Sequence, residues 1–202
     1  MGSPGPLKNG IILNPPNLPL RNFNLKKFLQ NKFKVRVEIE NDAKCVAIAE
    51  AVLGCKKKNF IILTLGTGIW GGIIINGELY KGMGNAGEFG AIIIDDKKTF
   101  EKWWQQYRKD YILKDLVKSK DKNSIQILEN LTSYLGQGIG SLTNIFDPEV
   151  VVLMGGAREA GDKLLSLIKK EIYKYEEFTK KTPIVWSKIE HPGLLGASLL
   201  VS

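Results

Sequence analysis

Residues 59–72, which read NFIILTLGTGIWGG, constrain the fold more than any other stretch of the chain. The apolar run at residues 60–63 predicts a buried strand, and it ends in Gly66-Thr67-Gly68. Closely spaced glycines at a strand end let several backbone N–H groups converge on an anion such as phosphate. The apolar run resumes at residues 73–75 and ends at Asn76-Gly77, a hairpin-turn pair. We therefore expect the glycines to join two antiparallel strands, and the alternative is a kinked hairpin whose glycines serve packing alone.

Composition indicates an ordinary globular protein, with 202 residues that are 44% hydrophobic and 25% charged. The net charge of +8 is scattered, without a basic arm or interleaved aromatic residues, so attraction of anionic ligands explains it more simply than nucleic-acid binding. Cys45 and Cys55 lack metal-ligand spacing and are expected to be free thiols. No signal peptide or membrane-length apolar run is visible, and we expect a cytoplasmic protein without a membrane partner.

The order of the expected elements predicts an α/β fold. The Pro- and Gly-rich first twenty residues are an odd beginning for a domain and look like the middle of one. Strands are expected at residues 10–13, 35–39, 60–63, 73–75, 92–94, 150–154 and 183–187. Helices are expected at residues 24–32, 43–53, 99–117, 124–146, 159–178 and 196–201.

Polar residues of interest lie where these elements meet. Asn41 and Asp42 stand between a strand and an Ala-rich helix, where either side chain is a plausible N-cap. Capping is the simplest explanation of Asp42. Glu88 is the lone acid in a glycine-rich loop at residues 79–90, and Gly155-Gly156 end the second buried strand.

Six segments, taken together and in this order, carry a resemblance to a known family. They are PGP, NDAKCVAIAEAVLG, LTLGTGIWGG, NGELYKG, AGEFG and NIFDPEVVVLMGGAREAGDKLL. The chain resembles the ROK family of sugar kinases and sugar-responsive repressors over residues 2–200. The resemblance implies an actin-like (ribonuclease-H-like) ATPase fold, with a mixed sheet flanked by helices and an incomplete N-terminal lobe. Residues 1–42 would be a remnant of the sugar-binding lobe and residues 43–202 the nucleotide-binding lobe.

The same resemblance implies roles for the site residues. Asp42 would be the general base for the sugar hydroxyl that attacks the γ-phosphate of ATP, with Mg²⁺ accompanying the nucleotide. The residues expected to bind the hexose are Gly5, Asn41, Asp42 and Glu88. The residues expected to bind the nucleotide are Gly66, Thr67, Gly68, Gly155 and Gly156. Self-association into a homo-oligomer is also implied.

Four departures from the family pattern qualify this expectation. The first phosphate loop of the family would precede residue 1. Ala91 replaces a histidine and no cysteine cluster follows, so we expect no structural zinc. Trp70 stands where a glycine is expected, and its indole could restrict phosphate access, stack on a ligand or point away. No helix-turn-helix is visible, which argues against a DNA-binding repressor. His191, the one histidine, is expected to be structural.

Three functional hypotheses follow. The first is an ATP-dependent sugar kinase that transfers the γ-phosphate to a hexose hydroxyl with Asp42 as general base. The second is a catalytically impaired ROK-like protein that binds a sugar or nucleotide. The third is a fragment of a longer kinase.

Overall fold

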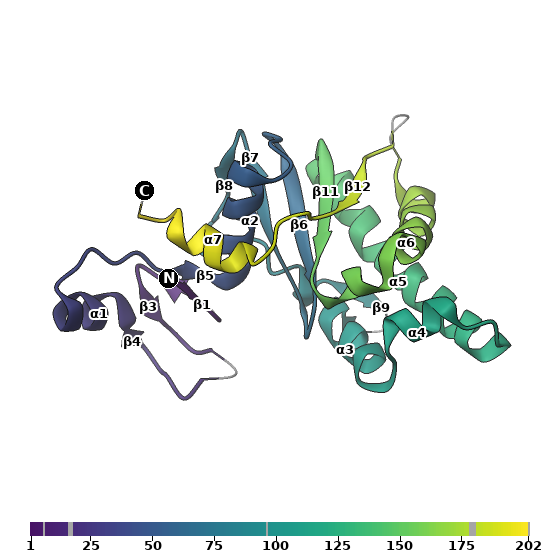
Figure 1. The fold of residues 1–202 in the computed structure, drawn as a ribbon, viewed down its shortest axis with the longest axis horizontal. Coiled ribbons are helices and arrows are strands. Elements are labelled where there is room, and N and C mark those ends of the chain that lie inside the picture. Colours follow the sequence, from purple (N-terminus) through teal and green to yellow (C-terminus); the bar gives the residue numbers. More distant parts are fainter. Residues whose placement is uncertain (6, 16–17, 96, 178–180, 202) are drawn as a thin grey trace. The chain divides into compact units, whose positions relative to one another are not determined.

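The computed structural model describes residues 1–5, 7–15, 18–95, 97–177 and 181–201. The chain forms two compact units that interleave along the sequence (Figure 1). The first unit comprises Met1–Lys58, Gly71–Gly87 and Lys188–Ser202, and the second comprises Asn59–Trp70 and Glu88–Ser187. The predicted assignment of residues 1–42 to a sugar-binding lobe and 43–202 to a nucleotide-binding lobe stays a prediction.

Helices and strands alternate along both units. The helices are α1 (Leu25–Phe33), α2 (Asp42–Leu53), α3 (Phe100–Asp110), α4 (Leu113–Lys118), α5 (Lys122–Phe146), α6 (Gly161–Tyr175) and α7 (Pro192–Ser198), with 3₁₀ turns η1 (Phe89–Ala91) and η2 (Gly156–Ala160). The strands are β1 (Gly2–Ser3), β2 (Leu7–Lys8), β3 (Ile11–Ile12), β4 (Phe23–Asn24), β5 (Glu40–Asn41), β6 (Phe60–Leu65), β7 (Ile69–Ile75), β8 (Glu78–Leu79), β9 (Ile93–Asp95), β10 (Lys98–Thr99), β11 (Val150–Met154) and β12 (Ile184–Trp186).

The core of the second unit is a parallel sheet in the order β12-β11-β6. The register pairs Val150 with Phe60 and Met154 with Thr64, so β11 and β6 run side by side over their full lengths. Both strands are apolar and almost fully buried, as expected for strands covered on both faces. Because they are parallel, both end at the same edge of the sheet.

Close packing of α5 on α6 depends on small residues of α5, and Figure 1 shows the two helices next to each other. A Cβ atom at Gly136 would lie 2.5 Å from Cβ of Glu171, and one at Gly140 would lie 2.8 Å from Cβ of Tyr175. These glycines therefore let the two helix backbones approach each other.

The first unit is built from strands and three helices, two of which, α2 and α7, pack against each other. β1 pairs in parallel with β5, and β2, β3 and β4 form an antiparallel sheet. Asn9-Gly10 turns β2 into β3, and Asn76-Gly77 turns β7 into β8; all four residues have positive φ, which matches a type I′ hairpin turn. α7 lies against α2 at Gly196, where a Cβ atom would lie 3.0 Å from Cα of Cys45.

The predicted class is confirmed as α/β, with parallel pairs in the second unit and an antiparallel β7-β8 pair in the first. The glycine run connects two consecutive strands, β6 and β7, as expected. The Asn76-Gly77 hairpin is also confirmed. Among the described residues, no helix is both long and apolar enough to cross a membrane.

Several predicted elements differ from the structure. The helix expected at residues 196–201 is α7, which begins at Pro192 and ends at Ser198, and the strand expected at residues 73–75 is β7, which already begins at Ile69. The strand expected at residues 35–39 is absent: Val35 is 57% exposed and β1, the parallel partner, reaches only Glu40 and Asn41. The helix expected at residues 99–117 breaks between α3 and α4. The helix expected at residues 159–178 begins at Gly161 and ends at Tyr175, and Phe178 lies outside the described residues.

Candidate functional site

Two glycine turns meet at one edge of the second unit's sheet. Gly66-Thr67-Gly68 follows β6, and Gly155-Gly156 follows β11, the parallel neighbour of β6. In open α/β sheets, ligands bind outside the carboxyl ends of the strands. The sheet register thus brings together the two runs that the sequence assigns to the nucleotide.

The two turns touch each other. Gly155 has φ of 97°, and a Cβ atom there would lie 2.7 Å from the carbonyl oxygen of Leu65. The turn after β6 is tight, because the N–H of Gly66 donates to the carbonyl of Gly68 at 3.2 Å. It is also anchored from α3, where the indole Nε1–H of Trp104 donates to the carbonyl of Gly66 at 2.8 Å. The backbone of this edge is therefore held in place.

Open space lies beside one glycine of each turn. A Cβ atom at Gly66 or Gly156 would meet no atom within 4 Å, and Thr67 is exposed. Exposed backbone next to open space is what a phosphate needs for close approach to N–H groups. The residues present therefore fit the phosphate chain of a nucleotide.

Gly68, in contrast, is covered by two side chains. A Cβ atom at Gly68 would lie 2.7 Å from Nε1 of Trp70 and still closer to the carboxylate of Glu101. Trp70 therefore lies against the turn and does not point away from it. Burial raises the pKa of Glu101, although a hydrogen bond from Gln105 to the carboxylate, at 3.0 Å, opposes the shift.

Glu101 is a site residue that sequence reasoning missed. It occupies the first turn of α3, whose N-cap is Thr99, and an acid in that position normally just stabilises the helix N-terminus. That its carboxylate also covers Gly68 becomes visible only in the structure, where α3 approaches the glycine turn.

In the first unit, Asn41 and Gly5 hold each other in place. Asn41 is the N-cap of α2: its Oδ1 accepts from the N–H of Lys44 at 3.2 Å. Its Nδ2 donates to the carbonyl of Gly5 at 3.4 Å. Gly5 has φ of 86° and lies so close to Pro15 that a Cβ atom would be 2.6 Å from the Cβ of the proline. Only glycine fits there.

Asp42 is left available by this arrangement, since Asn41 takes the capping role. Asp42 is the first residue of α2 and is exposed. Its Oδ1 accepts from the N–H of Ala43 at 2.8 Å, while Oδ2 has no protein donor among the described residues.

Glu88 belongs to the second unit and is half-buried at the N-terminus of η1. The turn that follows is close to the start of β7: a Cβ atom at Gly90 would lie 2.9 Å from Cβ of Glu101 and closer still to the carbonyl of Ile69. The backbone that follows Glu88 therefore packs against the start of β7, the strand that follows the Gly66–Gly68 turn.

The structure thus assembles the predicted residues into two groups. Gly5, Asn41 and Asp42 come together in the first unit. The five nucleotide-side residues come together in the second unit, which also holds Glu88.

A metal ion held by protein side chains alone needs several acidic, His or Cys ligands close together. The described residues contain no group of three or more His, Cys, Asp or Glu side chains that could hold one. Mg²⁺ in kinases keeps water ligands and binds mainly substrate phosphates, so it does not need such a group.

Comparison with known proteins decides the family. A sequence model described as the ROK family matches residues 1–202, the whole chain. The chain belongs to the ROK family. The resemblance that the motifs indicated is therefore confirmed.

Curated relatives of this ROK chain include both enzymes and regulators. A glucokinase of Halalkalibacterium halodurans is 31% identical over 217 residues, covering 87% of the chain and 66% of the relative. A xylose repressor of Bacillus spizizenii is 33% identical over 189 residues, covering 82% of the chain and 49% of the relative. The ROK chain thus spans about half to two thirds of the length of these relatives.

The fold comparison agrees. A ROK hexokinase from Thermus thermophilus is 26% identical, with a TM-score of 0.82 over 98% of the chain and 76% of that structure. The predicted actin-like fold is therefore confirmed.

Proposed function

We propose that the chain provides the catalytic part of an ATP-dependent sugar kinase of the ROK type, which transfers the γ-phosphate to a hexose hydroxyl with Asp42 as general base. One observation carries the proposal. Asn41 caps α2, so the exposed Asp42 carboxylate is spared that role and has an oxygen free of protein donors among the described residues. A carboxylate in that state can orient a hydroxyl and accept its proton.

Asp42 would act at a defined atom. Oδ2 accepts the proton of the sugar hydroxyl as the hydroxyl oxygen forms its bond to the γ-phosphorus, and the bond from that phosphorus to the bridging oxygen of ADP breaks. Asn41 and Gly5 hold the backbone beside Asp42, which keeps the carboxylate in position. We propose that Asn41, Gly5 and Glu88 contact the sugar, by the family resemblance.

The nucleotide side rests on the two glycine turns. Gly66, Thr67 and Gly68 would bind phosphate oxygens through backbone N–H groups, and Gly155 and Gly156 would lie against the adenosine. The open space beside Gly66 and Gly156 supports this assignment. ATP supplies the phosphoryl group, and Mg²⁺ bound to its phosphates neutralises charge that develops during transfer. Use of ATP is the reason to propose a cytoplasmic location.

A coupled assay with glucose, mannose, fructose and N-acetylglucosamine tests the proposal. We expect turnover of at least one sugar, and we expect Asp42→Asn to lower kcat by about 10²–10⁴-fold. Asp162→Asn is the matched control, because Asp162 is also an exposed acid in the first turn of a helix. Full turnover by Asp42→Asn would refute the role of Asp42 as base.

The 33% identity to a xylose repressor favours a second candidate, a ROK protein that binds a sugar or nucleotide without catalysis. Because repressors stand among the relatives, a nucleic-acid partner of the whole protein belongs to this candidate. Sugar binding by calorimetry with no turnover of any of the four sugars would support it over the kinase. A third candidate is a fragment of a longer kinase, in which turnover depends on residues beyond this chain. Homo-oligomer formation is proposed from the family resemblance alone.

A further inference from the structure

A pocket lies in the first unit, on the side of β5 from which Glu40 extends. It measures about 340 Å³ and lies between the β2-β3 hairpin, the start of α1, residues 38–40 and residues 81–84. Asn41 and Asp42 do not line it. Its volume is within the range of small-molecule sites, roughly 300–1,000 Å³.

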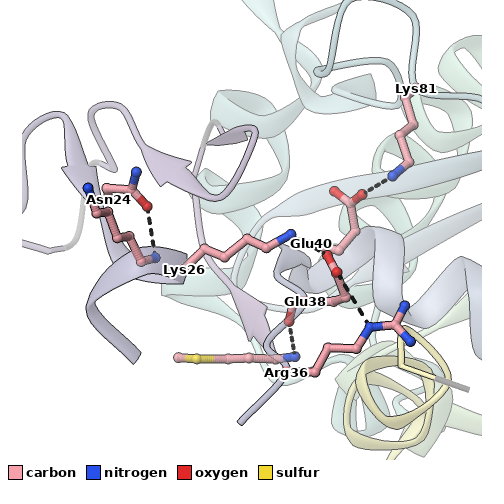
Figure 2. Close-up of polar contacts among 8 residues, drawn as sticks. Asn24, Lys26, Arg36, Glu38, Glu40 and Lys81 are labelled. Carbon is pink, nitrogen blue, oxygen red and sulfur yellow. Dashed lines mark hydrogen bonds and ion pairs between the residues drawn. The ribbon is translucent and has the colours of Figure 1, made fainter. Parts of the chain in front are cut away.

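Ion pairs arrange the walls of this pocket (Figure 2). Lys26 of α1 donates to Glu38 at 2.8 Å, and Lys81 pairs with Glu40 at 2.6 Å. The Lys26 hydrogen bond is the main reason why the pKa of Glu38 lies below its usual value. Each carboxylate therefore holds one ammonium group at the pocket wall.

These lysines keep donors for a ligand. An ammonium group has three N–H donors, and the structure shows one carboxylate oxygen bound to each of Lys26 and Lys81. Because the ion pairs already hold these lysine side chains in place, less side-chain entropy is lost when a ligand binds.

Lys8 supplies a third cation without a partner. It lines the pocket from the end of β2, is exposed, and makes no ion pair or hydrogen bond with the described residues. Three lysines and two glutamates line the pocket, so its net charge is +1. The excess positive charge attracts an anion.

The backbone around the pocket is also constrained. Lys44 of α2, which is 2% exposed, donates from Nζ to the carbonyl of Gly84. The N–H of Lys26 donates to the carbonyl of Gly10 at 3.2 Å. Both the hairpin and residues 81–84 are thereby fastened to helices, and the three lysines extend from fastened segments.

We propose that this pocket binds a small hydroxylated phosphomonoester, such as a hexose phosphate. The phosphate oxygens accept from Lys8, Lys26 and Lys81, while Glu38 and Glu40 accept from ligand hydroxyl groups. This binding does not require the kinase reaction, and it takes place on residues other than Asp42 and the glycine turns.

Backbone amide NMR shifts during titration with glucose 6-phosphate, inorganic phosphate and glucose test the proposal, because they report where each probe binds. We expect glucose 6-phosphate, up to about 10 mM, to shift the amides of residues 7–10 and 81–84. Inorganic phosphate should shift the same amides more weakly, and glucose should leave them unchanged. Loss of affinity at higher ionic strength is also expected.

Lys8→Glu should weaken glucose 6-phosphate binding at these amides at least tenfold. The exposed Lys109→Glu on α3 is the control, because it makes the same change in net charge elsewhere and should leave affinity unchanged. Shifts confined to residues 66–68, equal binding of glucose at residues 7–10 and 81–84, or an unaffected Lys8→Glu variant would each overturn the proposal. None of these results depends on turnover, so failure here is separate from failure of the kinase proposal.

Discussion

At the scale of single residues, the decisive detail is that Asn41 is the N-cap of α2 and Asp42 is its exposed first residue. Both are ordinary N-cap residues, and the sequence alone leaves the choice between them open. The geometry gives the cap to Asn41, whose other end donates to Gly5. Asp42 is therefore not the N-cap, although its Oδ1 still accepts the N–H of Ala43 in the first turn of α2.

The partly buried carboxylate of Glu101 should lower the stability of the fold in a pH-dependent way that can be measured. Burial raises the pKa of Glu101 in the folded protein above the ordinary value of 4.5. Between the unfolded and the folded pKa, the folded protein therefore binds more protons than the unfolded protein. Stability therefore falls as pH rises through the two pKa values, and the cost is absent below the unfolded value. Glu101→Gln removes the charge but keeps the oxygen that accepts from Gln105.

We expect Glu101→Gln to raise the Tm at pH 7 by no more than about 2 °C, since solvent screens a half-exposed group. The gain should vanish below about pH 4. Thermal unfolding from pH 3.5 to 8 measures it, with the exposed Glu129→Gln as control. A gain that is the same at all pH values would show that the carboxylate charge is not the cause.

At the scale of elements, glycines decide where helices can touch. α7 approaches α2 at Gly196, where a Cβ atom would overlap the backbone of Cys45. Gly193, in the same short helix, has its nearest such contact at 3.9 Å from Cγ2 of Val46. The two positions make a matched pair, because both substitutions add one methyl group to the same helix.

Gly196→Ala should lower the free energy of unfolding by about 2–3 kcal/mol through overpacking, with a Tm drop of about 4–10 °C. Gly193→Ala should stay within about 1 kcal/mol of the parent, because a methyl group fits there and alanine favours the helix. Urea unfolding of the three proteins measures both effects. Equal losses in the two variants would mean that α7 does not pack on α2 through Gly196.

Breaks in regular structure show why element boundaries were harder to predict than element types. The pattern VRVEI at residues 35–39 alternates like a strand, yet a strand needs a partner, and β1 reaches only Glu40 and Asn41. Strands of two residues, such as β2 and β3, are too short to show a period, so the Asn9-Gly10 hairpin between them was missed. Long buried runs such as β6 and β11 were predicted because their signal is local.

For the whole molecule, the proposed nucleotide residues all belong to the second unit, whereas the proposed sugar residues are divided, with Glu88 in the second unit and the others in the first. Gly5, Asn41 and Asp42 belong to the first unit, and both glycine turns belong to the second. Each ligand should therefore protect a different set of amides, and the two effects can be measured one at a time.

Hydrogen exchange with a non-hydrolysable ATP analogue and Mg²⁺ should slow exchange at residues 65–68 and 154–157. A sugar that is turned over should slow exchange at residues 2–5 and 41–44. About tenfold slowing corresponds to about 1.4 kcal/mol of added protection. Peptides from α6 serve as an internal control, since α6 contributes no proposed ligand residue. Protection by the nucleotide at residues 41–44 alone would contradict the assignment of the glycine turns.

The sequence by itself determined the family and the α/β order, and it proposed the candidate site residues, whose roles stay predictions. These features are local: an apolar run, a glycine pair or an Asn-Asp dipeptide is complete within a few positions. Tertiary structure alone decided which of Asn41 and Asp42 caps α2, that Trp70 and Glu101 cover Gly68, and that three lysines line one pocket. The contacts of Asn41 with Gly5, of Glu101 with Gly68 and among the segments that carry the three lysines join groups far apart in sequence, whose approach is set by packing and not by any pattern along the chain.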